Sequence, residues 1–245
     1  MSDDDDAARY AGAAGALLMD LRARHAAEGR GGSALGDAGD RLANELLLEL
    51  LAGEHVDDAV LSEESADDAR RLDADRVWII DPLDGTREFS EPGRSDWAVH
   101  VALWERRHGV RAAAVALPAQ HLVLGTATPP VVPPRGDRQM RVVVSRSRPP
   151  AVARRVAAAL DAELVTLGSA GAKTMAVVSG EVDAYVHAGG QYEWDSAAPT
   201  AVARAAGLHV SRLDGAPLVY NRSDPWLPDL MVCRPELTDA ILAVQ

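Results

Sequence analysis

The segment that most constrains this chain is residues 81–86, with the sequence Asp-Pro-Leu-Asp-Gly-Thr. It directly follows the apolar run 77–80, which predicts a short buried β-strand. Pro82 has no amide hydrogen to donate to a sheet, so we expect the strand to end near Asp81. Gly85 permits backbone conformations that other residues resist, which favours a tight turn. The sequence therefore predicts two carboxylates on a turn at a strand end, an oxygen-rich arrangement that hard divalent cations prefer.

A calcium-binding EF-hand loop also combines Asp and Gly at close spacing. Such a loop requires oxygen-bearing side chains at alternate positions and a Glu at the twelfth position. Counted from Asp81, the third position is Leu83 and the twelfth is Pro92. The sequence therefore excludes an EF-hand at this place.

Length and composition predict a globular protein with a sizeable core. The chain has 245 residues, of which 47% are apolar, enough for one large domain or two closely packed subdomains. Its only cysteine, Cys233, excludes an intrachain disulfide and a multi-cysteine metal site. The formal net charge of -12 argues against binding to nucleic acid polymers. No apolar run is long enough for a transmembrane helix, and the acidic start is unlike a signal peptide, so we expect a cytoplasmic protein without membrane contact.

Hydrophobic periodicity predicts a mixed α and β fold. Helices are expected over 7–28, from a cap at Asp37 to about 52, over 149–160, 170–179 and 197–206, and from 235 onward. Strands are expected over 59–61, 77–80, 97–104, 110–117, 122–126, 141–145, 164–167, 182–186, 208–211 and 230–233.

The order of these elements suggests two halves. The second half alternates strands and helices, which favours an α/β layer. Four prolines and a glycine lie between Thr128 and Asp137 and mark the boundary. We expect an acidic disordered tail at 1–6 and a single domain at 7–245, divided into an α+β subdomain at 7–133 and an α/β subdomain at 138–245.

Acidic residues stand at three strand ends or turns: Glu63, the pair Asp81 and Asp84, and Asp195. Taken singly, such a residue is more often a helix cap or turn residue than a ligand, and Glu63 alone suits a solvated surface charge. Together they favour a functional reading, because bunched carboxylates repel one another unless cations lie between them.

In chain order, these motifs resemble those of the inositol monophosphatase superfamily of magnesium-dependent, lithium-sensitive phosphatases. The resemblance spans about residues 10 to 235 and is carried by 81–86, by Glu63-Glu64 before it and by 194–198 after it. Within the superfamily, 85–89 and 193–195 resemble the CysQ branch of 3′(2′),5′-bisphosphate nucleotide phosphatases. The segment 168–173 adds to this, since that branch places a lysine there beside the substrate phosphate.

The resemblance implies a layered αβαβα sandwich of the inositol monophosphatase and fructose-1,6-bisphosphatase type, with the site between its two halves. It implies two to three Mg²⁺ ions, held by Glu63, Asp81, the Leu83 carbonyl, Asp84 and Asp195. A third ion, held mostly through water, would lie near Glu63, which counts among the catalytic residues.

The resemblance also implies how water and substrate are bound. Thr86, paired with Asp40, would orient and deprotonate the attacking water. The implied substrate contacts are Gly85, Thr86, Ser169 and Lys173. Lys173 is the only lysine of the chain, and we expect it to contact the second phosphate of a bisphosphate.

The favoured reaction is removal of the 3′-phosphate from adenosine 3′,5′-bisphosphate or its 5′-sulfated form, a step of sulfate assimilation. The first alternative is the same chemistry on inositol monophosphate or fructose 1,6-bisphosphate. An alternative from another class is a metal-binding regulatory protein without catalysis. The resemblance also favours a homodimer. His100, His187 and His209 lie on apolar runs, and we interpret them as core or surface histidines and not as ligands.

Overall fold

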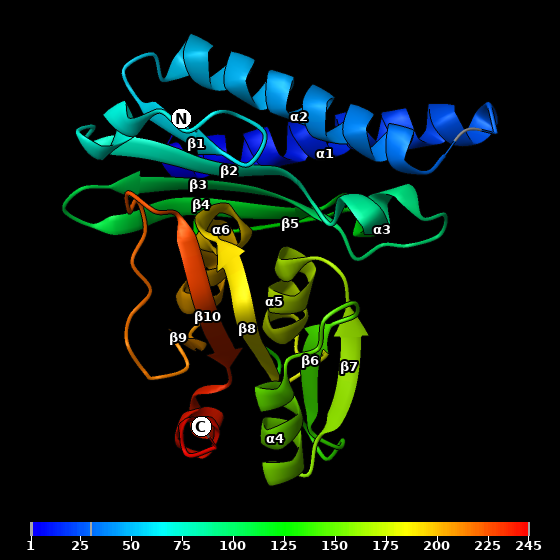
Figure 1. Cartoon of the computed structure of the whole chain (residues 1–245), viewed down its shortest axis with the longest axis vertical. Helices are drawn as coiled ribbons and strands as arrows, with labels where there is room; N and C mark the ends of the chain where they lie inside the picture. Colours follow the sequence, from blue (N-terminus) through cyan, green and yellow to red (C-terminus); the bar gives the residue numbers. More distant parts are fainter. Residues whose placement is uncertain (1, 30, 245) are drawn as a thin grey trace.

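In the computed structural model, residues 2–29 and 31–244 are described. They form five layers in the order helix, sheet, helix, sheet, helix (Figure 1). The α-helices are α1 (Asp3–Ala27), α2 (Ser33–Glu54), α3 (Thr86–Ser90), α4 (Ala151–Ala159), α5 (Ala170–Val178), α6 (Glu193–Ala205) and α7 (Thr238–Leu242). The strands are β1 (Ala59–Ser62), β2 (Arg76–Asp84), β3 (Ala98–Glu105), β4 (Gly109–Leu117), β5 (Leu122–Gly125), β6 (Arg141–Ser145), β7 (Glu163–Leu167), β8 (Ala184–Tyr192), β9 (His209–Ser211) and β10 (Trp226–Cys233). Short 3-10 helices span Ala69–Leu72, Pro118–Gln120 and Pro235–Leu237.

The first sheet has the strand order β1-β2-β3-β4-β5. Its β1 runs parallel to β2, and the other neighbours are antiparallel. Helices α1 and α2 cover its outer face, where Trp78, Phe89 and Trp97 pack among alanines and leucines. The small side chains of the two helices allow close approach to the sheet, which suits a chain with few aromatic residues.

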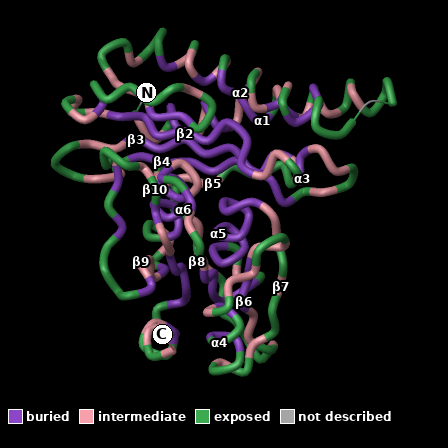
Figure 2. Tube along the Cα trace, viewed as in Figure 1, coloured by how far each residue is buried: buried purple, intermediate pink, exposed green. Residues whose placement is uncertain are grey.

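The second sheet has the order β7-β6-β8-β10-β9. Strand β6 runs parallel to β7 and β8, whereas β10 is antiparallel to β8 and β9. Helices α5 and α6 lie between the two sheets and bury apolar residues from both, and the elements α4 and α7 pack on the far face (Figure 2). The layered αβαβα sandwich expected from the sequence is confirmed.

The N-terminal acidic residues are ordered, so the predicted disordered tail is wrong for the described residues 2–6. They form the cap and first turn of α1, where the Ser2 hydroxyl accepts a hydrogen bond from the Asp5 amide at 3.2 Å. Asp3 pairs with Arg76 at 2.7 Å, and Asp6 is buried. Carboxylates in a first turn are stabilised by the positive end of the helix dipole, which accounts for the order.

Several predicted boundaries also move: β8 continues to Tyr192 and α6 begins at Glu193, and two further shifts lie near the acidic turn. Helix α2 begins at Ser33, directly after Gly32, so the expected cap Asp37 lies one turn inside it. Strand β2 continues past Pro82 to Asp84, because the register with β3 shifts between Asp81 and Asp84. A bulge interrupts the hydrogen bonds between strands, so Pro82, which has no amide hydrogen, fits there without loss of a sheet hydrogen bond. Among the described residues, none of the helices combines the length and apolar character needed to cross a membrane.

Candidate active site

Acidic residues from three separate elements converge between the two sheets. Asp81 and Asp84 come from the bulged end of β2, Glu63 follows β1, and Asp195 lies in the first turn of α6. A cavity of about 440 Å³ is lined by Glu63, Asp84 and Asp195, among others. Asp81 is fully buried behind it, with its Oδ1 accepting a hydrogen bond from the Leu83 amide at 3.1 Å. The structure therefore brings together the four carboxylates predicted from the sequence.

Three of these carboxylates resist ionisation. Glu63 is an exposed residue that lines the cavity. Desolvation of its carboxyl group and repulsion from Asp195 raise its pKa to about 8. Burial and the Asp84 charge raise the pKa of Asp195 to about 6. Burial, then repulsion from Glu63, raises the pKa of Asp81 well above its usual range. Such a group of carboxylates gains most from cations placed between them.

Asp84 behaves in the opposite way. Its pKa falls to about 2, because the donors around it outweigh the effect of burial. Its Oδ2 accepts hydrogen bonds from the Gly171 amide at 2.6 Å and from the Ser169 hydroxyl. His100 Nε2 lies 3.2 Å from the same oxygen. All three groups use Oδ2, which leaves Oδ1 available to a metal ion.

Ser169 is buried beside the acidic site, and its predicted contact with substrate stays a prediction. Its buried hydroxyl donates to Asp84 and accepts from the Ala172 amide at 2.9 Å. Both hydrogen-bonding roles of the hydroxyl are thus used inside the protein. Ser169 caps α5 and orients Asp84.

His100 is a site residue that the sequence reasoning missed. It is a core histidine, as expected, but its fully buried ring lies between the acidic turn and α6. Nδ1 lies 3.0 Å from the Trp194 carbonyl oxygen, and since a carbonyl only accepts, Nδ1 carries the hydrogen. A Cβ at position 171 would lie 2.1 Å from Nε2, so Gly171 makes room for the ring. His100 is the β3 partner of Asp81, and this cross-strand register was the signal that could have found it.

Thr86 and Asp40 meet as predicted from the sequence. Thr86 Oγ1 lies 3.1 Å from Asp40 Oδ1 and 3.3 Å from the Leu83 carbonyl oxygen, and its single proton can serve one of them at a time. Burial and repulsion from Glu64 raise the pKa of Asp40 to about 7. A carboxylate with such a pKa is suited to accept a proton near neutral pH.

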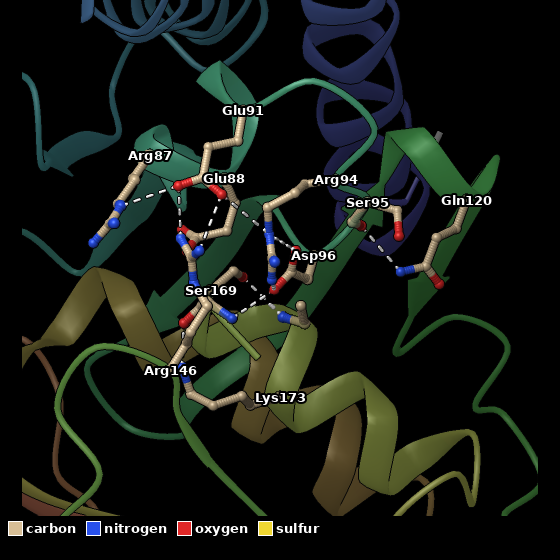
Figure 3. Close-up of polar contacts among 12 residues, drawn as sticks. Arg87, Glu88, Glu91, Arg94, Ser95, Asp96, Gln120, Arg146, Ser169 and Lys173 are labelled. Atoms are coloured by element: carbon tan, nitrogen blue, oxygen red, sulfur yellow. Dashed lines mark hydrogen bonds and ion pairs between the residues drawn. The ribbon is translucent and has the colours of Figure 1, made fainter. Parts of the chain in front are cut away.

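Lys173 lies in the first turn of α5 and is only 3% exposed. Its ammonium group donates to the Gly168 carbonyl and lies 5.3 Å from the centre of the Tyr185 ring (Figure 3 shows the lysine below Ser169). Burial lowers its pKa, and the charges of Asp84 and Asp195 act in the opposite direction. Lys173 thus supplies a buried cation on the cavity wall.

An ionic cluster ties α3 to the second sheet beside the cavity (Figure 3). Arg146, which follows β6, pairs with Glu88 at 2.6 Å and with Glu91 at 3.0 Å. Asp96 pairs with Arg94 and accepts the Gly168 amide at 2.7 Å. These contacts fix the α3 end of the acidic turn against the loop that carries the start of α5.

The site fits divalent cations. Asp81 Oδ2 is buried and has no hydrogen-bond partner among the described residues. Atoms of Asp81, Asp84 and His100 lie within 4.8 Å of one another, with the two carboxylates as candidate ligands and the imidazole engaged with Trp194 and Asp84. An unpaired buried carboxylate oxygen in an oxygen-rich group is a natural ligand for a hard cation.

Comparisons with known proteins agree with this geometry. A sequence profile described as "Inositol monophosphatase family" matches residues 4–244. The "3′-phosphoadenosine 5′-phosphate phosphatase" of Mycobacterium tuberculosis (strain CDC 1551 / Oshkosh) is 55% identical over 94% of this chain and 88% of that relative. The "3′(2′),5′-bisphosphate nucleotidase CysQ" of Escherichia coli (strain K12) is 29% identical over 78% of this chain and 81% of that relative. The crystal structure of staphylococcal IMPase-II superposes with a TM-score of 0.79 at 17% identity, covering 99% of this chain and 94% of that one, which supports the fold alone.

Proposed function

The chain belongs to the inositol monophosphatase family and is a phosphatase, and we propose that it removes the 3′-phosphate of adenosine 3′,5′-bisphosphate to give AMP. The 5′-sulfated form of this nucleotide is a second expected substrate. The observation that carries the hydrolytic chemistry is the convergence of four carboxylates beside the Thr86–Asp40 pair. The choice of substrate is supported by the name of the relatives that share more than half of the residues.

We propose that the site works with two to three Mg²⁺ ions. The residues that would hold them are Glu63, Asp81, Asp84, Asp195 and the carbonyl of Leu83. When bound, the ions activate water, neutralise phosphoryl oxygens and stabilise the leaving alkoxide. Phosphate ester hydrolysis is among the slowest uncatalysed reactions, so charge stabilisation of this kind is required.

The protein's own groups position the reaction. Thr86 holds its hydroxyl between Asp40 and the Leu83 carbonyl, so it can accept a hydrogen bond from water while it donates to Asp40. Asp40, with its raised pKa, takes up the proton that the water releases. The amides of Gly85 and Thr86 open α3 and would contact the phosphate. Lys173 would compensate the charge of the second phosphate from the cavity wall.

Phosphate release measured with malachite green tests this function. The purified protein is incubated with MgCl₂ and one ester at a time: adenosine 3′,5′-bisphosphate, its 5′-sulfated form, inositol 1-phosphate or fructose 1,6-bisphosphate. We expect the highest kcat/KM for the bisphosphate nucleotide, loss of activity in EDTA and inhibition by lithium. A higher kcat/KM for inositol 1-phosphate would refute the proposed substrate, and no release from any ester would refute catalysis.

The assembly is a separate proposal. From the family resemblance we propose a homodimer, which light scattering coupled to gel filtration measures. A monomer mass at micromolar concentration would refute it.

A further inference from the structure

Two exposed aromatic side chains line the cavity that contains the acidic site. Among the large apolar residues of the described chain, the only exposed aromatic ones are Tyr192, at 45% exposure, and Trp226, at 43%. Both line the same cavity as Glu63, Asp84 and Asp195. The sequence contains only ten phenylalanine, tyrosine and tryptophan residues, so the coincidence of two exposed rings at one cavity calls for a ligand.

The two rings are held in place by regular structure. Tyr192 and Trp226 are register partners at the ends of the antiparallel strands β8 and β10, so their side chains project from the same face of the sheet. Tyr192 stacks on Trp194, with ring centres 4.7 Å apart and planes 12° from parallel. Tyr192 remains 45% exposed despite this stacking. The pair is thus a preformed surface for a flat group.

Trp226 is fixed by a close approach to the backbone. A Cβ at position 190 would lie 2.5 Å from Trp226 Nε1, so the indole rests directly on Gly190. Gly190 has a φ of 92°, a conformation that favours glycine. A larger residue at position 190 would push the indole away from the cavity. The backbone at Gly190 therefore accommodates the indole of Trp226 closely. An exposed side chain without a role would not need such a close fit.

The rings of Tyr192 and Trp226 also lie beside the carboxylates at which we propose the phosphate binds. The Tyr192 amide donates to Asp195 Oδ2 at 2.6 Å, so the aromatic residue directly adjoins a predicted metal ligand. In a nucleoside phosphate, the base is joined to the phosphate through one sugar ring. A phosphate at the carboxylates can therefore carry its base to the rings of residues 192 and 226.

We propose that Tyr192 and Trp226 form the subsite for the planar base of a nucleotide, bound by stacking. This inference rests on the proposed function and deepens it, because it assigns the part of the site that distinguishes a nucleotide from a polyol phosphate. Every base has a π face, so stacking alone accepts several bases and does not select adenine. The subsite therefore selects the class of substrate by its flat ring.

Binding of a matched ligand pair tests the subsite without turnover. Adenosine 5′-monophosphate and ribose 5-phosphate differ only in the base, and their dissociation constants are measured by calorimetry on the full chain in MgCl₂, where adenosine 5′-monophosphate is the product of the proposed reaction. We expect the wild type to prefer the ligand with the base by about 5- to 150-fold, since stacking of one base is worth about 1–3 kcal/mol. Trp226→Leu and Tyr192→Leu should each shrink this ratio, whereas Val123→Ala, at a residue 42% exposed on β5, should leave it intact.

Turnover gives a second readout. In Trp226→Leu the ratio of kcat/KM for adenosine 3′,5′-bisphosphate to kcat/KM for inositol 1-phosphate should fall, mainly through KM for the nucleotide. Equal weakening of both ligands in the binding assay would overturn the inference and assign the rings to the sugar or to structure. An unchanged ratio in both leucine variants would place the base elsewhere. A wild type that does not hydrolyse the bisphosphate nucleotide would reject the proposed function instead, and the binding ratio would still decide on the subsite.

Discussion

Replacing His100 with alanine tests whether the buried imidazole sets the geometry of the acidic site. The ring is fully buried and contacts the Trp194 carbonyl at 3.0 Å and Asp84 at 3.2 Å. Its loss removes one hydrogen bond, worth about 0.5–1.5 kcal/mol, and leaves a cavity of the kind that costs about 2–5 kcal/mol when a large buried side chain is cut to alanine. We expect the free energy of unfolding to fall by about 2–4 kcal/mol, taking the lower part of that range because the ring is polar.

The expected fall corresponds to a Tm lowered by roughly 4–16 °C for a chain of this size, measured by differential scanning fluorimetry. The imidazole also links Asp84 on β2 to the helix that carries Asp195, so we expect a loss of about 10- to 100-fold in Mg²⁺ affinity or in kcat. The control is His108→Ala, at an exposed residue in the turn between β3 and β4. His100→Gln, which keeps a donor, should recover part of both losses. A His100→Ala variant that melts within 1 °C of the wild type and keeps its Mg²⁺ activation curve would refute the reasoning.

Three further predictions concern the same site. Asp84→Asn should abolish turnover because it removes the charge from the site carboxylate whose pKa is lowered, whereas Asp214→Asn, in an exposed turn, should keep at least half of the wild-type kcat; equal losses in the phosphate assay would contradict this. The metal-free protein should lose stability as the pH rises from about 4 to 8. The pKa values of Glu63 (about 8) and Asp195 (about 6) lie above their ordinary values. In that pH range the folded state therefore binds more protons than the unfolded chain, and raising the pH favours unfolding. Melting curves in EDTA at pH 5 to 8 test whether the Tm falls with pH as expected. MgCl₂ should raise the Tm most at pH 8. A Tm that rises with pH in EDTA would contradict the prediction. Lys173→Met should raise KM for the bisphosphate nucleotide more than KM for inositol 1-phosphate, and equal KM changes would remove its assignment to the second phosphate.

The sequence was sufficient wherever the chemistry is local. The run 77–80 is apolar at every position, and the structure buries it between two layers in a strand that pairs with β1 and β3. The alternation after residue 138 likewise predicted the second sheet with its helices. The acidic start was misread because composition alone treats four adjacent aspartates as a solvated tail. Its order depends on a cap from Ser2 and on a distant partner, Arg76, which a local pattern does not contain.

For the site, the motifs predicted which carboxylates meet but not how each is held. Ser169 was assigned to the substrate by the family resemblance of residues 168–173, and the sequence did not indicate the contact of its hydroxyl with Asp84. His100 looked like an ordinary core residue because its importance comes from the register of β3 against β2. The two contacts were missed for one reason: the partner of a buried polar group lies on another element, and the spacing of residues along the chain does not specify it.

The two carboxylates of residues 81–86 show what this non-local contribution does. Asp81 and Asp84 share one turn, yet the pKa of Asp81 is raised and that of Asp84 is lowered. The difference arises because Asp84 accepts hydrogen bonds from the start of α5 and lies 3.2 Å from the His100 ring on β3, whereas one oxygen of Asp81 has no partner among the described residues. Since α5 belongs to the second half of the chain, the charge on Asp84 depends on the docking of the two halves. The acidic turn therefore acquires its cation-binding character only in the assembled fold, and the ionic cluster around Arg146 holds that assembly at the edge of the site.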